Sequence, residues 1–72
     1  MRWTPARLDQ LERAARDPRR VALRRRGTEY VVVARRVGIQ GGRDVLTAML
    51  PMTGEEVTFV LDDLDHLEVL DA

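Results

Sequence analysis

The apolar residues of this chain change their spacing once, at Pro18, and that change limits the folds that the chain can adopt. Before it, Leu8, Leu11 and Ala15 recur at the spacing of one helix face. After it, apolar and polar residues alternate with a period of about two, as on strands with one buried face. A chain of 72 residues has room for one hydrophobic core. We therefore expect a single domain over residues 1–72, a helix followed by strands.

The helix has sequence signals at both ends. Thr4 is a good N-cap for the first free backbone N–H groups, and Pro5 suits the first helical position. The residue before a proline disfavours the helical conformation, so Asp17 ends the helix. We predict an amphipathic helix over residues 4–16.

Turn residues divide the rest of the chain into five expected strands. The turns are Gly27-Thr28, a loose glycine-rich stretch over 38–42, and Pro51 to Gly54. A fourth turn, over residues 62–65, contains three aspartates around Leu64. We expect the aspartates to be solvated and Leu64 to be buried, although Asp62, Asp63 and Asp65 could also be read as a divalent-metal cluster. The predicted strands cover residues 21–24, 30–34, 45–50, 56–61 and 67–70.

This order predicts a mainly β fold, a five-stranded Sm-like (SH3-like) barrel over residues 20–70 with an N-terminal α-helix. Strand alternation assigns the core. Trp3 is spaced to pack on Leu8, and Tyr30 is expected near the core, with base stacking as its alternative role. The predicted core residues are Leu8, Leu11, Val21, Leu23, Val32, Leu46, Val57, Phe59, Leu61, Leu64, Leu67 and Val69.

Charge is divided between the two halves of the chain. Residues 1–36 hold eleven arginines against four acidic residues, a net charge of +7, and residues 37–72 hold one arginine against eight acidic residues, a net charge of −7. Every basic residue is arginine. Arginine suits bidentate recognition of phosphate or carboxylate, but a GC-rich genome would give the same bias without selection on chemistry.

The chain offers few groups for catalysis. It has one histidine, His66, and neither serine nor cysteine, so a serine nucleophile, a Cys-His pair and a thiolate metal site are excluded. We therefore expect no enzyme activity, metal, cofactor or small-molecule substrate. No apolar run has the length of a membrane span, and the N-terminus lacks the apolar segment of a signal peptide, so a cytoplasmic protein is expected.

Two segments resemble known small barrels. The segment RRVALRRRGTEYVVVARR, residues 19–36, is similar to the opening strands of Sm and Hfq-type proteins, and EEVTFVLDDLDHLEVL, residues 55–70, resembles their closing strand, turn and strand. The layout looks at least as much like the Rho-inhibiting Rof family, through Leu61-Asp62-Asp63-Leu64, and WYL domains end similarly. The resemblance implies a regulatory, protein-binding or RNA-binding barrel. Residues 37–42 lack the Asp and Asn with which Sm proteins hold uridine, so no binding residue is transferred.

One arginine cluster is the predicted binding site. We expect Arg24 and Arg26 to share a face of the first hairpin, Arg25 to lie at its turn, and Arg35 and Arg36 to converge with them on one edge. This edge would contact an acidic protein face, a second copy of the chain or a nucleic-acid backbone. Alternatively, Glu68 and the 62–65 turn would neutralise it within the chain or between copies. The expected function is a non-catalytic protein-interaction or regulatory module, Rof-like or homo-oligomeric, and the alternative is RNA or single-strand nucleic-acid binding.

Overall fold

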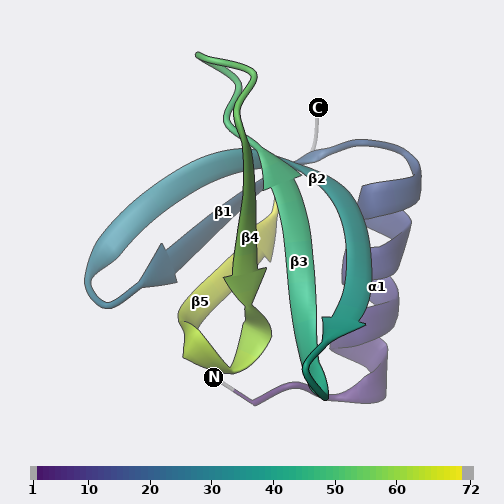
Figure 1. Cartoon of the computed structure of the whole chain (residues 1–72). Coiled ribbons are helices and arrows are strands. Elements are labelled where there is room, and N and C mark those ends of the chain that lie inside the picture. The colour runs from purple at the N-terminus through teal and green to yellow at the C-terminus, as the bar shows by residue number, and fades with distance from the viewer. Residues whose placement is uncertain (1, 71–72) are drawn as a thin grey trace.

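A helix followed by a five-stranded antiparallel sheet forms the fold (Figure 1), as the computed structural model of residues 2–70 shows. The mainly β class with one N-terminal helix is thus confirmed. Among the described residues, no helix is long and apolar enough to cross a membrane. The elements are α1 (Pro5–Arg16), β1 (Arg20–Arg25), β2 (Thr28–Gln40), β3 (Arg43–Met49), β4 (Glu56–Val60), the 3-10 turn η1 (Leu61–Asp63) and β5 (Leu64–Val69).

The cap and the prolines predicted to bound α1 do mark its two ends. The Thr4 hydroxyl accepts a hydrogen bond from the backbone N–H of Arg7 at 3.2 Å, and Pro5 occupies the first turn. The helix ends at Arg16, just before the Asp17-Pro18 pair. Its buried residues are Leu11, Ala14 and Ala15, and this face packs mainly against β2 (Figure 1).

The sheet has the strand order β4-β3-β2-β1-β5, so β4 and β5 form its two edges although they are neighbours in the chain. Only the three residues of η1 separate them. Four residue steps, from Val60 to Leu64, reach at most about 14 Å, whereas the edges of a flat five-stranded sheet lie about 19 Å apart. The sheet is therefore strongly curled. Within the described part of the chain, no backbone ladder joins β4 to β5, so the sheet is not closed.

Strand β2 is the longest strand and differs most from its prediction. It continues from Thr28 through Gly38 to Gln40, so the expected loose stretch over 38–42 is wrong except at its end. The turn consists of Gly41 and Gly42, both with positive φ. The first half of β2 pairs only with β1, and its pairing with β3 begins at Val33. As a result, the β1–β2 hairpin projects away from β3 and β4 (Figure 1).

The core lies inside the curled sheet and is closed on one side by α1. Of the predicted core residues, Leu8, Val57 and Val69 are only partly buried but pack against the core, and the others are buried. Leu64 is 2% exposed, as predicted, and Asp62 and Asp65 are exposed, whereas Asp63 is partly buried. The predicted turn over 62–65 is wrong in its second half, because η1 ends at Asp63 and β5 begins at Leu64. The core residues absent from the predicted list are Ala14, Ala15, Ala34, Val45 and Ala48.

Candidate functional site

The five predicted site arginines form two separate groups. In the β1–β2 ladder Arg25 pairs with Thr28 and Arg20 pairs with Val33, so the end of β1 lies beside the beginning of β2. Arg35 lies seven residues farther along β2 than Thr28, which is about 23 Å of strand. The expected convergence on one edge is therefore wrong. Arg24 to Arg26 lie at the hairpin end, and Arg35 and Arg36 lie beyond the other end of β1.

The hairpin end itself is arranged differently from its prediction. Arg26 and Gly27 form the two-residue turn, with φ of 51° and 79°, so Gly27-Thr28 is not the turn and Arg25 does not lie in it. Arg25 is the last residue of β1 and continues the core-facing row of Val21 and Leu23. Arg24 points to the other face. Arg26 lies in the turn, outside the strand, and both Arg24 and Arg26 are exposed.

The guanidinium of Arg25 lies over two aromatic rings. Its central carbon is 5.1 Å from the centroid of the Phe59 ring and 5.7 Å from that of Tyr30. The two rings meet edge to face at 5.5 Å. Cation–π contacts of this kind attract a guanidinium to the ring face and contribute about 0.5–1 kcal/mol each at exposed sites. We name the adjoining cavity the aromatic pocket; it has about 300 Å³ and is lined by Arg25, Tyr30, Leu50, Val57, Thr58 and Phe59.

Arg35 and Arg36 lie at a β-bulge beside the helix. Ala34 pairs with Ala48 and Arg36 with Thr47, so Arg35 is the extra residue. Because a bulge interrupts strand alternation, both consecutive arginines are exposed. Arg16, from the last turn of α1, joins them. We name the resulting cavity the helix groove; it has about 290 Å³ and is lined by Glu12, Ala15, Arg16, Arg35, Arg36 and Val37.

Within residues 2–70, neither of the two groups of predicted arginines is neutralised by an ion pair. The salt bridges join Arg13 to Asp9 at 2.6 Å and Arg19 to Asp17 at 3.2 Å, all with exposed side chains. Across residues 2–70 no ion pair involves the five predicted arginines, so the expected neutralisation by Glu68 and the 62–65 turn is not seen within the chain. No group of three or more His, Asp or Glu side chains in the same range is placed to hold a metal ion.

Arg16 lines the helix groove but is not among the predicted site residues, because its spacing in the sequence does not show that α1 packs beside the β2 bulge. Arg25 is a predicted binding residue, but its place over two aromatic rings was not predicted. Alternation from Val21 and Leu23 was the signal for it, since it places Arg25 on the core-facing side. No family model, no curated protein and no solved structure matches this chain.

Proposed function

We propose that this chain is a non-catalytic interaction module that binds an acidic surface of a partner protein through the helix groove. The observation that carries the proposal is that Arg16, Arg35 and Arg36, from two elements distant in sequence, line one groove. Guanidinium groups bind carboxylates with two parallel hydrogen bonds, and three of them in one groove favour an acidic surface over a neutral one.

The apolar part of the groove favours a protein partner. Two of its lining residues are apolar, Ala15 buried and Val37 half-buried, and a third, Glu12, is exposed. Protein interfaces combine an apolar centre with a polar margin and are enriched in arginine. Glu12 also lowers the net positive charge of the groove. This weakens its attraction to a phosphate backbone, which is uniformly negative. Its attraction to a protein surface of mixed charge is weakened less.

The proposal includes a barrel of the Sm-like type. The strand order β4-β3-β2-β1-β5, the strong curl and the short η1 turn between the two edge strands are consistent with such a barrel. In this arrangement the helix closes one side of the core and the groove lies between the helix and the bent strand β2. The resemblance to Rof-type regulators then supports an adaptor role, and a second copy of the chain would be one acidic partner of the groove.

Two charge-reversal variants test the role of the groove. Arg35→Glu/Arg36→Glu changes the groove, and Arg24→Glu/Arg26→Glu makes the same change in charge at the far end of the hairpin. The probe is a fluorescent peptide of alternating Glu and Leu, and the readout is its anisotropy at several salt concentrations. We expect the groove variant to weaken binding roughly tenfold or more and the matched variant to change it little. Equal losses, or no binding by the unmodified chain, would overturn the proposal.

Self-association is measured on the same proteins. If the acidic partner surface belongs to a second copy, sedimentation velocity shows a dimer or larger species that is lost in the Arg35→Glu/Arg36→Glu variant. A species that persists in this variant would exclude the groove as its interface.

Single-stranded nucleic acid is the second candidate partner. The observation that favours it is that Arg24 and Arg26 are exposed at the hairpin end and lack ion pairs within residues 2–70. Binding of this kind falls with salt, and each lost phosphate contact reduces the logarithmic slope by roughly 0.7 for a single strand. Anisotropy with a labelled single-stranded RNA therefore separates the candidates, since only this candidate predicts the larger loss in Arg24→Glu/Arg26→Glu.

A further inference from the structure

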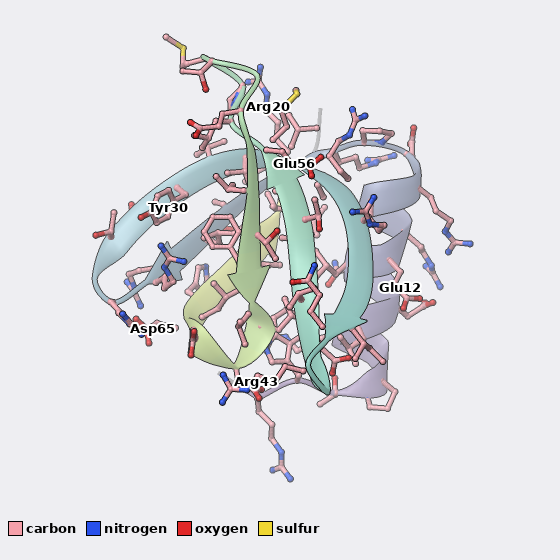
Figure 2. The ribbon with its side chains drawn as sticks, viewed as in Figure 1. Glu12, Arg20, Tyr30, Arg43, Glu56 and Asp65 are labelled. Carbon is pink, nitrogen blue, oxygen red and sulfur yellow. The ribbon has the colours of Figure 1, made fainter. Side chains whose placement is uncertain are left out.

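The aromatic pocket exists because the sheet opens between its two halves. β2 pairs with β3 only from Val33 onward, and β4 pairs only with β3. Tyr30, on the first half of β2 (Figure 2), meets the ring of Phe59 on β4 across this opening, edge to face at 5.5 Å. The walls of the pocket come from both sides of this opening. The aromatic pocket lies at the opposite end of the β1–β2 hairpin from the helix groove. An inference about the pocket therefore does not depend on the proposed function.

The walls of the pocket are mainly apolar. Leu50 and Val57 are half-buried and Phe59 is 2% exposed, and the ring of Tyr30 completes the wall on the hairpin side. A volume of about 300 Å³ is at the lower end of the range for small-molecule sites, which is roughly 300–1,000 Å³. An occupant therefore has a small apolar body, such as one ring or one branched chain.

Arg25 adds one cation to these apolar walls. Across the described residues its guanidinium makes no hydrogen bond and no ion pair, although the side chain is half-buried. No buried side-chain nitrogen or oxygen atom of that range lacks a hydrogen-bond partner, so the N–H groups of Arg25 are accessible from the pocket side or from solvent. The contacts with Phe59 and Tyr30 restrain the position of the guanidinium in advance, and preorganisation of this kind lowers the entropic cost of binding.

We propose that the aromatic pocket binds a small monocarboxylate, with its apolar body against Phe59, Leu50 and Val57 and its carboxylate on the guanidinium of Arg25. The planar fork of N–H donors matches a carboxylate in a bidentate manner. One cation in an apolar cavity fits a singly charged planar anion better than a phosphate dianion. A free organic acid and the C-terminal carboxylate of a peptide with an apolar last residue share this chemistry.

The experiment is a titration followed by ¹H–¹⁵N NMR, with phenylacetate as the probe. We expect saturable shifts of the Arg25 side-chain Nε–H and of the backbone amides of Tyr30, Val57 and Phe59. Phenylacetamide, which has the same ring without the charge, should bind roughly tenfold more weakly, and acetate, which lacks the apolar body, should show no saturation. A short peptide ending in Phe, compared with its C-terminal amide, distinguishes a peptide carboxylate from a free acid.

Variants of Arg25 complete the test. Arg25→Lys keeps the charge but removes the planar fork, and Arg25→Gln removes the charge; both should weaken phenylacetate binding roughly tenfold. Arg24→Gln is the matched control, because Arg24 is the neighbouring strand residue on the other face, and its binding should stay unchanged. The spectrum without probe shows whether each variant is folded. Equal binding of phenylacetate and phenylacetamide, or unchanged binding in folded Arg25→Gln, would overturn the proposal.

Discussion

The indole Nε1–H of Trp3 donates a hydrogen bond to the backbone carbonyl of Leu61, with a distance of 2.9 Å between nitrogen and oxygen. The two residues are 58 positions apart. The bond connects the segment before α1 to η1, the turn that links the two edge strands of the sheet. Trp3 also packs against the core, as Leu8 does. A side chain expected to stabilise the start of the helix thus also holds the turn that brings β4 and β5 together.

We predict that Trp3→Phe lowers the free energy of unfolding by at least about 0.5–1.5 kcal/mol, because the Leu61 carbonyl loses its donor and a smaller aromatic ring replaces the indole. For a domain of this size, each kcal/mol corresponds to about 4–8 °C in melting temperature. Urea unfolding followed by circular dichroism measures the change. Tyr30→Phe is the control, since the Tyr30 hydroxyl makes no hydrogen bond within residues 2–70. Equal stability of Trp3→Phe and the unmodified chain would show that the hydrogen bond contributes nothing.

Phe59→Ala should lower the free energy of unfolding by about 3–5 kcal/mol, a large share of the stability of a small domain. The ring is 2% exposed and contacts Tyr30, and its loss would also remove one of the two rings beneath Arg25. Thermal melts provide the measurement. Thr58→Ala changes the neighbouring exposed residue of the same strand and should cost less than about 1 kcal/mol. If Phe59→Ala kept its melting temperature, Phe59 would not belong to the core.

Local signals carried most of the fold prediction. Thr4, Pro5 and Pro18 act on the backbone next to them, so the bounds of α1 follow from the sequence. Burial of Phe59 follows from alternation along one strand. Gly38 was misleading, because glycine is common in turns but is also tolerated inside a strand when its side-chain position faces open space.

The arrangement of the site did not follow from the sequence, because it depends on how the strands pair and on how α1 packs on the sheet. An antiparallel hairpin with a turn at Arg26-Gly27 necessarily places Arg35 beyond Arg20, and an incorrect turn position concealed this register. The sequence does not predict the bulge at Arg35, because two consecutive arginines occur in any exposed segment, whether strand, turn or loop. The packing of α1 beside β2, which adds Arg16 to the helix groove, depends on tertiary contacts that no local pattern encodes.

The strand assignment of Gly38 makes a prediction that a loop assignment does not. Gly38 has an ordinary backbone conformation, and an added Cβ meets nothing within 4 Å, so Gly38→Ala should raise stability by about 0.5–1 kcal/mol. Gly42 has a φ of +78°, so Gly42→Ala should lower stability by about 1–2 kcal/mol. Chemical denaturation of both variants measures the contrast. If both variants lost stability to a similar extent, residues 38–42 would form a single loop and the strand assignment of Gly38 would be wrong.

Arg26→Asn should stabilise the chain. Arg26 has a φ of 51°, a left-handed conformation that costs most residues about 1 kcal/mol or more, and Gly27 follows it with a φ of 79°. Two-residue hairpin turns with positive φ at both positions favour Asn-Gly, because asparagine tolerates this conformation. We expect the free energy of unfolding of Arg26→Asn to rise by about 0.5–1 kcal/mol, which circular dichroism would show as a higher melting temperature.

Arg26→Val tests the same turn in the opposite direction. A β-branched side chain is strongly disfavoured at positive φ, so this variant should melt below the unmodified chain. Arg24→Asn controls for the loss of charge, since Arg24 lies within the strand, where asparagine brings no gain. If Arg26→Asn and Arg24→Asn changed stability alike, the turn would not lie at Arg26-Gly27. The register that separates the two arginine groups, and that places Arg25 over Phe59, would then also be wrong.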